Sequence, residues 1–598
     1  MPTLHYTVAM PQPQTHLYDV ELHVRGFSQD HYDFVIPSWT PGSYMIREFA
    51  RHVQEFAAFD AAGAALTWHK HNKNTWRVAT PAHEDMLVLR YKVYANELTV
   101  RTSHLDTSHG YFNGANLFMY LDGQRKHPVT LTVQVPYVEW KVATGLPRRG
   151  DDATSDPRQY AFQADDYDHL IDCPVECSDH RLLSFEVEGV LHQIALWGHG
   201  NEDLERLRLD TQAAVQATRD LFGSLPYDYY LFILHLTERG RGGLEHRNSS
   251  SNAVTRWSFR KPADYENVIS LLTHEFFHVW NVKRIEPASF REFEYRWETY
   301  TRLLWVFEGF TTYYTPLLLR RAGFLTPERT LESFAEQILR LLQTPGRHVQ
   351  SAEEASFDAW IKFYRPDENS QNSSVSYYLK GSLIALLLDL EIRSRTANQR
   401  SLDDVLLTTY HDYTLQGLGV PDDEFQTICE RIVGGSLQPF FANYVRGVAE
   451  LPFDELLGRA GLVLSYGWKG SDADHSAGLG VRVRQSNGRT VIDTVFADGP
   501  AYSADLSSGD ELVALDGYRI SEETLGDRLA ERHPGEQVTL TVFRRDELRH
   551  VPVTLGKRPY NRLDIHPRAD ATAAEKALYE AWLRAPWPAP SSQKETAA

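Results

Sequence analysis

The chain has 598 residues, of which 42% are hydrophobic, 24% charged and 12% aromatic. This length is too great for a single hydrophobic core, so we expect several domains, and the composition excludes a largely disordered protein. The formal net charge of -19 provides no basic surface for nucleic acid or anionic lipid, so we expect neither as a partner.

Cysteine usage and the termini indicate the compartment. An odd, sparse set of three cysteines, Cys173, Cys177 and Cys429, does not form a disulfide framework. The N-terminus lacks a basic segment followed by an apolar core, and the longest strongly apolar run, 383–388, is too short to cross a bilayer. We therefore expect a cytoplasmic protein without a membrane-spanning segment.

The pattern of apolar residues changes twice along the chain. Short alternating runs at 18–24, 87–94 and 129–135 predict an N-terminal β-domain over residues 1–175. Helical spacing at 203–221 and a strand at 229–236 open a second domain, 176–459, where further helices are predicted at 266–282, 331–342 and 377–392. Short strands return in a third domain, 460–557, and we expect 558–598 to be a frayed tail. The predicted class is α+β and multidomain.

The strongest chemical signal lies inside the helix predicted at 266–282. His274 and His278 are four residues apart, so both imidazoles can reach one cation from one helix face, with Glu275 beside it. The apolar residues on both sides indicate a buried helix, where two histidines without a partner would be costly.

A catalytic zinc site needs a third protein ligand and an open position. Glu308, set among aromatic residues in the segment Trp305-Val306-Phe307-Glu308-Gly309-Phe310, is the best candidate. On spacing alone other carboxylates compete with it: Glu286, Glu292, Glu294 and Glu298.

The two segments together resemble the gluzincin zinc metallopeptidases, in which the glutamate of the Glu-Gly-Phe segment is the third zinc ligand. The resemblance implies that role for Glu308 and the role of general base for Glu275. The sequence departs from the aminopeptidase pattern in one respect. The 29 residues between His278 and Glu308 make a longer interval than that pattern has, which implies an insertion.

Two further segments resemble the same group. Tyr378-Leu379-Lys380-Gly381 is similar to the segment whose tyrosine stabilises the oxyanion, which implies that role for Tyr378. Gly242-Gly243-Leu244-Glu245-His246 is similar to the segment that lies along the substrate and whose glutamate holds the α-amino group. That likeness places Gly242, Gly243 and Glu245 in the substrate site, although Leu244 and His246 replace the usual methionine and asparagine. From residue type alone, Tyr378 could equally be a packed tyrosine, and Glu245 could pair with a nearby arginine.

The third domain resembles a PDZ domain of the bacterial peptidase type. A carboxylate-binding loop is predicted at Leu479, Gly480 and Val481, and its ligand would be a C-terminal peptide. The alternative is a groove that serves only packing or oligomer contacts.

Together with Trp39-Thr40-Pro41-Gly42-Ser43-Tyr44, these segments resemble the glycyl aminopeptidase family over nearly the whole chain. The resemblance implies a thermolysin-like catalytic domain at 176–459, one zinc ion, and hydrolysis of the first peptide bond of peptides with a free N-terminus and a small first residue, glycine or alanine. The alternatives are a zinc endopeptidase or an epoxide hydrolase on the same metal site, or a non-catalytic peptide-binding scaffold that uses the PDZ domain.

Overall fold

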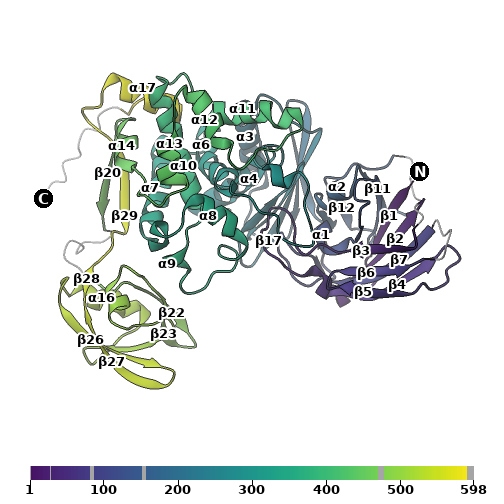
Figure 1. Cartoon of the computed structure of the whole chain (residues 1–598), viewed down its shortest axis with the longest axis horizontal. Coiled ribbons are helices and arrows are strands. Elements are labelled where there is room, and N and C mark those ends of the chain that lie inside the picture. The colour runs from purple at the N-terminus through teal and green to yellow at the C-terminus, as the bar shows by residue number, and fades with distance from the viewer. Residues whose placement is uncertain (1, 27–28, 81–85, 151–155, 469–476, 589–598) are drawn as a thin grey trace. The chain divides into compact units, whose positions relative to one another are not determined.

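The computed structural model describes residues 2–26, 29–80, 86–150, 156–468 and 477–588 (Figure 1). The chain divides into two compact units. The first comprises residues 1–300, 322–324 and 413–419, and the second comprises residues 301–321, 325–412 and 420–598. The predicted α+β multidomain class, with a β-rich N-terminal domain, a helical middle and a C-terminal PDZ domain, is confirmed. The predicted boundaries at 175, 459 and 557 remain predictions.

The N-terminal domain is built on a six-stranded sheet. The sheet has the order β13-β11-β1-β2-β7-β4, with the bounds β1 (Thr3–Ala9), β2 (Leu17–Arg25), β4 (Val53–Asp60), β7 (Met86–Tyr94), β11 (Val129–Gln134) and β13 (Gln159–Ala164). Alternate residues of β1 (Leu4, Tyr6 and Val8) are buried, because successive side chains of a strand point to opposite faces.

Two four-stranded sheets complete this domain. The first consists of β3 (His31–Val35), β5 (Trp68–Asn72), β6 (Thr75–Ala79) and β10 (Tyr120–Leu121). The second consists of β8 (His104–Leu105), β9 (Gly110–Phe112), β12 (Lys141–Thr144) and β14 (Val175–Ser178). Two short helices, α1 (Gly114–Leu117) and α2 (Tyr167–Ile171), lie in the connections.

A five-stranded sheet follows in the same unit, in the order β15-β16-β17-β19-β18. Its elements, with two helices, are β15 (Arg181–Val187), β16 (Val190–Trp197), α3 (Leu204–Phe222), β17 (Tyr229–Thr237), β18 (Gly242–Glu245), β19 (Ser249–Thr255) and α4 (Pro262–Phe277). β17 pairs in parallel with both neighbours and is buried at every residue after the first, as is typical of a central parallel strand. β18 is an antiparallel edge strand.

The second unit begins with a group of helices around α10. These are α5 (Leu304–Phe307), α6 (Gly309–Arg321), α7 (Pro327–Leu342), α8 (Ala352–Phe357), α9 (Ser370–Ser373), α10 (Tyr377–Arg395), α11 (Leu402–Asp412), α12 (Phe425–Val433), α13 (Gln438–Phe440) and α14 (Phe453–Gly458). α10 is buried along almost its whole length and contacts α5, α6, α7, α8, α11, α12 and α14, so it is the central helix of this group.

The PDZ domain is a sheet of the order β22-β23-β24-β26-β27, with β25 paired to β24 and helix α16 beside it. The bounds are β21 (Ala477–Gly478), β22 (Val481–Ser486), β23 (Arg489–Val495), α15 (Pro500–Ser503), β24 (Glu511–Leu515), β25 (Tyr518–Arg519), α16 (Glu522–Ala530), β26 (Gln537–Arg544), β27 (Glu547–Thr554) and β28 (Gly556–Lys557). It has its own apolar core, centred on Leu540, Val542 and Val553.

The C-terminal segment differs from the expectation of a frayed tail. β29 (Arg562–Pro567) pairs with β20 (Leu462–Gly467), and α17 (Ala573–Leu583) follows. Trp582 is 1% exposed, and its Nε1 donates to the hydroxyl of Tyr313 on α6 at 2.9 Å. This segment therefore packs on the helices of the second unit. The last part of the predicted tail, 589–598, lies outside the described residues.

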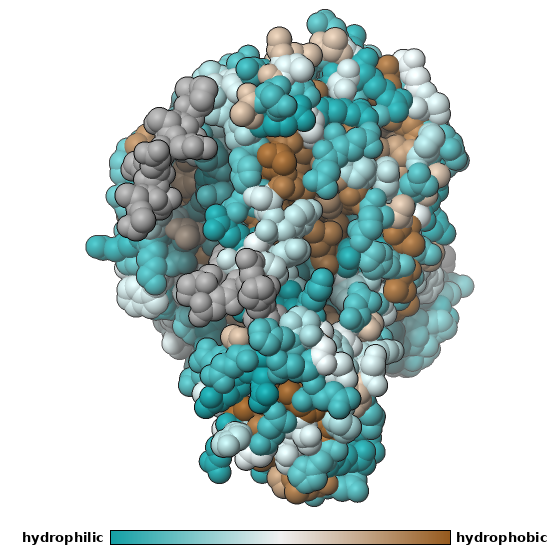
Figure 2. Space-filling view, turned by 90° about the vertical axis from the view of Figure 1, so that its left-hand side faces the viewer, coloured by the Kyte–Doolittle hydropathy of each residue, from teal (hydrophilic) through white to brown (hydrophobic). Residues whose placement is uncertain are grey.

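Across the described ranges, no helix is both long enough and apolar enough to span a bilayer. The face drawn in Figure 2 is mainly hydrophilic, and its apolar side chains lie in short strips between polar ones.

Candidate metal centre and substrate site

The metal-binding motif lies at the C-terminal end of α4. Pro262 occupies the first turn, where its missing N–H is not needed, and apolar side chains such as Val268 and Leu272 bury the helix in the first unit. The helix ends at Phe277, five residues before the predicted end. Val279 and Trp280 donate to carbonyls three residues back, which tightens the chain into a turn.

This turn fixes the tautomer of His278. The Nδ1 of His278, which is 1% exposed, lies 2.6 Å from the carbonyl oxygen of Asn281. A carbonyl can only accept, so Nδ1 carries the proton and Nε2 presents a lone pair. That Nε2 lies 3.2 Å from the Nε2 of His274. Two nitrogens bound to one zinc at 2.0–2.1 Å in a tetrahedron are about 3.3 Å apart. The pair therefore fits a shared zinc ion.

The predicted base, Glu275, lies against the edge strand β18. It is 5% exposed, and a Cβ added at Gly243 would come 1.9 Å from its Oε1. Only glycine fits at this position, because any side chain would overlap the carboxylate. Ligand atoms of Glu245, Glu275 and His278 lie within 4.8 Å of one another. The first unit thus brings the predicted base, the predicted amine anchor and one predicted metal ligand together.

Glu245 lies at the end of β18 and is 4% exposed. Among the described residues its Oε1 accepts no hydrogen bond. A buried carboxylate oxygen without a donor is costly, so the site is suited to a cationic partner. A cavity of about 1310 Å³ is lined by Glu245, His246 and Gly42, among other residues of the first unit.

His246, which stands where the family pattern has asparagine, takes part in a buried ion network. Its Nδ1 lies 3.1 Å from Asp172, and the ammonium of Lys283 lies 2.7 Å from the same carboxylate. Burial alone would raise the pKa of Asp172, but Lys283 and His246 outweigh it and hold that pKa below its usual range. The replacement therefore has a structural partner on the N-terminal domain.

Arg101 is a site residue that the sequence did not indicate. Its guanidinium donates to the carbonyl oxygen of Gly243 at 3.3 Å, so it fixes the strand that faces Glu275. Arg101 and Gly243 are 142 residues apart, and no local pattern marks the arginine.

The remaining catalytic candidates lie in the second unit. Glu308 follows α5 directly, precedes α6 and is 2% exposed. Tyr378, in the first turn of α10, is half-buried, and its ring stacks on Phe363. Lys380 is buried, and burial lowers its pKa to about 8.

Two glycines bring the segments of Glu308 and Tyr378 close together. A Cβ on Gly309 would lie 2.5 Å from the backbone of Gly381, and a Cβ on Gly381 would lie 2.4 Å from the carbonyl oxygen of Trp305. Helix backbones can approach this closely only where side chains are absent. This contact explains the glycine in both the Glu-Gly-Phe and the Lys-Gly segments.

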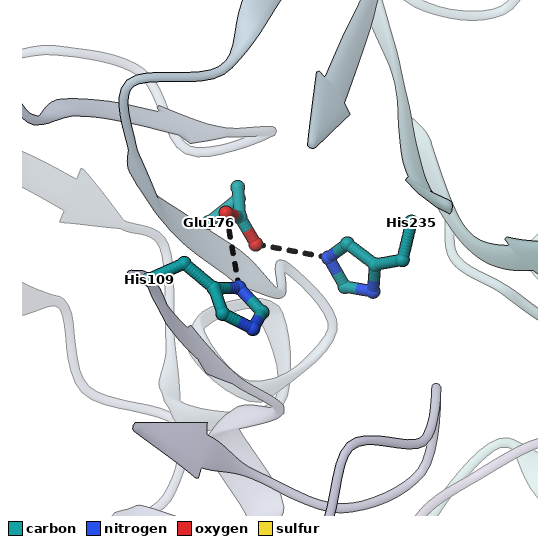
Figure 3. Close-up of side chains that lie close together, drawn as sticks. All are labelled: His109, Glu176 and His235. Atoms are coloured by element: carbon teal, nitrogen blue, oxygen red, sulfur yellow. Dashed lines mark hydrogen bonds and ion pairs between the residues drawn. The ribbon is translucent and has the colours of Figure 1, made fainter. Parts of the chain in front are cut away.

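A second histidine–glutamate cluster lies apart from this site in the first unit (Figure 3). Glu176 on β14 accepts from His109 Nδ1 at 3.4 Å and from His235 Nε2 at 2.9 Å, and all three residues are fully or almost fully buried. Both rings point a nitrogen at the carboxylate, unlike His274 and His278, whose nitrogens face each other. The hydrogen bonds of the cluster link β14 to β17, whereas His109 Nε2 is buried and has no hydrogen-bond partner among the described residues.

The predicted PDZ loop lies between β21 and β22. Leu479 is 2% exposed, its carbonyl accepts from Ala501 N, and that of Gly480 accepts from Phe496 N, both at 2.9 Å. Gly480 has a φ of +75°, and a Cβ there would lie 2.5 Å from Gly499, so the loop requires glycine. Val481, partly buried, begins β22.

Comparison with known proteins identifies the family. Three family models match: the Peptidase M61 N-terminal domain at residues 5–179, M61 glycyl aminopeptidase at 267–384 and a PDZ domain at 477–555. The crystal structure of an aminopeptidase N family protein from Idiomarina loihiensis is 30% identical, with a TM-score of 0.90 over 97% of this chain and 100% of that chain. An M1 zinc metallopeptidase from Deinococcus radiodurans is 15% identical, with a TM-score of 0.49 over 75% of this chain and 94% of that one. A search of curated protein sequences finds no match.

The fold and the motif helix, with the family models and the Idiomarina loihiensis structure, make the chain a metallo-aminopeptidase, a hydrolase that carries a PDZ domain. It belongs to the M61 glycyl aminopeptidase family.

Proposed function

We propose that the protein is a zinc aminopeptidase that removes a single small residue, glycine or alanine, from the N-terminus of peptides. One zinc ion would be held by His274, His278 and Glu308. The observation that carries this proposal is the hydrogen bond from His278 Nδ1 to the Asn281 carbonyl, because it leaves the Nε2 lone pair facing His274 at 3.2 Å. Glu308 is supported by its residue type, its burial and the family motif.

When bound, zinc supplies Lewis acidity, which polarises the scissile carbonyl and lowers the pKa of water. Glu275 takes the proton of the attacking water and passes it to the leaving amine. Its place against the backbone of Gly243 holds the carboxylate in one position. Tyr378 donates a hydrogen bond to the developing oxyanion, a role worth a few kcal/mol in comparable sites.

Glu245 binds the α-amino group of the substrate. Its buried Oε1, which accepts no hydrogen bond among the described residues, supports this role because an ammonium would satisfy it. An anchor beside the scissile bond limits cleavage to one residue at a time. The preference for glycine and alanine rests on membership of the glycyl aminopeptidase family.

The test is hydrolysis of aminoacyl p-nitroanilides of Gly, Ala, Leu and N-blocked Ala by the wild type and by Glu275→Gln, with the zinc content of both. We expect the free-amine Gly and Ala substrates to be cleaved and the blocked substrate to remain intact. Glu275→Gln should keep its zinc and lose turnover. Cleavage of the blocked substrate would make the protein an endopeptidase, and absence of both cleavage and metal would favour a peptide-binding scaffold.

The PDZ domain supports a second, peptide-binding function. β22 pairs only with β23 among the described strands, so its other edge can accept a strand from an extended peptide. We propose that a C-terminal peptide binds there with its carboxylate at Leu479, Gly480 and Val481. The cytoplasmic location remains a prediction.

A further inference from the structure

The turn at residues 39–44 comes from the N-terminal domain and reaches the predicted amine anchor. Ser43 N donates to Thr40 O at 3.1 Å, which closes the turn, and Gly42 has a φ of +82°. Trp39 on one side is fully buried, and its Nε1 donates to the carbonyl of Trp297 at 2.9 Å. Tyr44 on the other side is 1% exposed and stacks on Phe290. The turn is therefore held at both ends.

Gly42 lies directly against Glu245. A Cβ built on Gly42 would lie 2.7 Å from Oε1 and 2.8 Å from Oε2 of Glu245, and 2.7 Å from Cδ1 of Leu244. Real Cβ atoms essentially never come within 3.0 Å of another heavy atom, so all three contacts are too short for a side chain. Leu244 is fully buried and Glu245 is 4% exposed, so a displaced carboxylate would have to move into the cavity that Glu245 lines.

Among the described residues Glu245 Oε1 accepts no hydrogen bond, so on this side the close approach of Gly42 limits where the carboxylate can lie. A carboxylate that is held by hydrogen bonds would keep its position better, when a neighbouring residue is enlarged, than one that is held only by van der Waals contact. We propose that Gly42 is a positioning residue of the N-terminal domain, which sets where the Glu245 carboxylate meets the substrate α-amino group. This inference rests on the proposed role of Glu245 as the amine anchor.

The test is the steady-state kinetics of Gly42→Ala on glycyl p-nitroanilide. The added methyl group displaces the carboxylate from the ammonium, so KM should rise at least tenfold while the zinc content is unchanged. Gly63→Ala is the matched control. Gly63 has a φ of +83°, and a Cβ added there would meet nothing within 4 Å, so this variant has the same backbone strain without the contact. Its KM should stay within twofold of the wild type.

A double-mutant cycle separates the contact from a folding defect. In a Glu245→Ala background the methyl group meets no carboxylate and only the contact with Leu244 remains, so adding Gly42→Ala should change KM less than twofold. A further tenfold rise of KM in that background would show that the glycine acts through the fold and not through the carboxylate, and the inference would be wrong. If Glu245→Ala raises KM and Gly42→Ala alone does not, the inference fails and the proposed function stands. If Glu245→Ala itself leaves KM unchanged, both are overturned.

Discussion

The carbonyl of Asn281 determines which ring nitrogen of His278, the residue that follows α4, can bind a cation. A pair of imidazoles one helical turn apart can face solvent or each other, and either ring nitrogen can carry the proton. The 2.6 Å contact to His278 Nδ1 removes that freedom, since a carbonyl must receive a proton. The helix must end at Phe277 for this contact to form. The early end of the helix is therefore what allows His278 to adopt the orientation of a metal ligand.

Gly243→Ala tests the placement of the base. The new Cβ would lie 1.9 Å from Glu275 Oε1, so the carboxylate must move away from β18. We expect kcat on alanyl p-nitroanilide to fall at least tenfold while the zinc content stays that of the wild type, since His274 and His278 are untouched. Gly467→Ala, also at a strand glycine but with nothing within 4 Å, serves as the control. An unchanged kcat in Gly243→Ala would show that Glu275 does not need its present position.

Site residues that lie close together along the chain could be predicted from the sequence. Site residues whose contacts are distant in sequence could not. His274, Glu275 and His278 are neighbours along one helix, so spacing alone indicated a shared cation. Arg101 and Gly42 meet β18 from positions more than 100 residues away, and no periodic pattern encodes such a contact. The long interval between His278 and Glu308 looked like an insertion. Its residue Tyr295 in fact belongs to the buried core of the N-terminal domain.

At the scale of elements, segments with strong apolar periodicity were predicted correctly as helices or strands. The main structured part that the sequence did not predict is the C-terminal segment. α10 was predicted at 377–392 and spans Tyr377–Arg395. α17 was not predicted, because it is short, lies near the C-terminus and follows segments without regular apolar spacing. In sequence, such a segment is typical of a frayed tail. Its stability comes from burial of Tyr579, Trp582 and Leu583.

Trp582→Ala tests whether α17 stabilises the second unit. The side chain is 1% exposed, packs near Phe334 and donates to Tyr313, so its removal leaves a cavity and an unfilled hydrogen bond. We expect a loss of about 3–5 kcal/mol in the stability of that unit, seen as a clear drop in its Tm by calorimetry. Trp257→Ala, at a tryptophan that is 62% exposed, should shift the Tm little. Equal small shifts in both variants would contradict a stabilising role for α17.

His192 on β16 makes the five-stranded sheet sensitive to mild acid. Burial lowers its pKa to about 4, and its ring stacks on Phe185 and contacts the Tyr227 hydroxyl. The folded protein therefore keeps this imidazole neutral, whereas the unfolded chain protonates it below about pH 6.5. Proton binding to the unfolded state lowers stability as pH falls from about 6.5 to 4, by an amount on the order of 2–3 kcal/mol.

The measurement is the Tm of the wild type and of His192→Gln between pH 4 and 8. We expect the difference between the two to shrink as pH falls through this window, because the variant lacks the titrating group. The carboxylates whose pKa is lowered, such as Asp172, lose their contribution only at lower pH and so affect both proteins alike. If Tm fell equally with pH in the wild type and in His192→Gln, His192 would not be the source of the acid sensitivity.

At the scale of the whole chain, the Idiomarina loihiensis structure matches 97% of this sequence, and this match includes the N-terminal domain, the motif helix and the PDZ domain. If the metal is held by His274, His278 and Glu308 as proposed, it binds only the folded chain, since the three side chains are not a preformed site when unfolded. Its binding must then add to stability by mass action.

Removal of zinc with a chelator should therefore lower the Tm of the intact protein, and added zinc should restore it in proportion to the logarithm of its concentration above the Kd. His274→Gln and Glu308→Gln should lose this response, because each removes a ligand. Glu275→Gln should keep it, because the base is not a ligand, and this contrast separates loss of metal from loss of chemistry. A Glu308→Gln protein that still binds and responds to zinc like the wild type would return the third ligand position to the other carboxylates: Glu286, Glu292, Glu294 and Glu298.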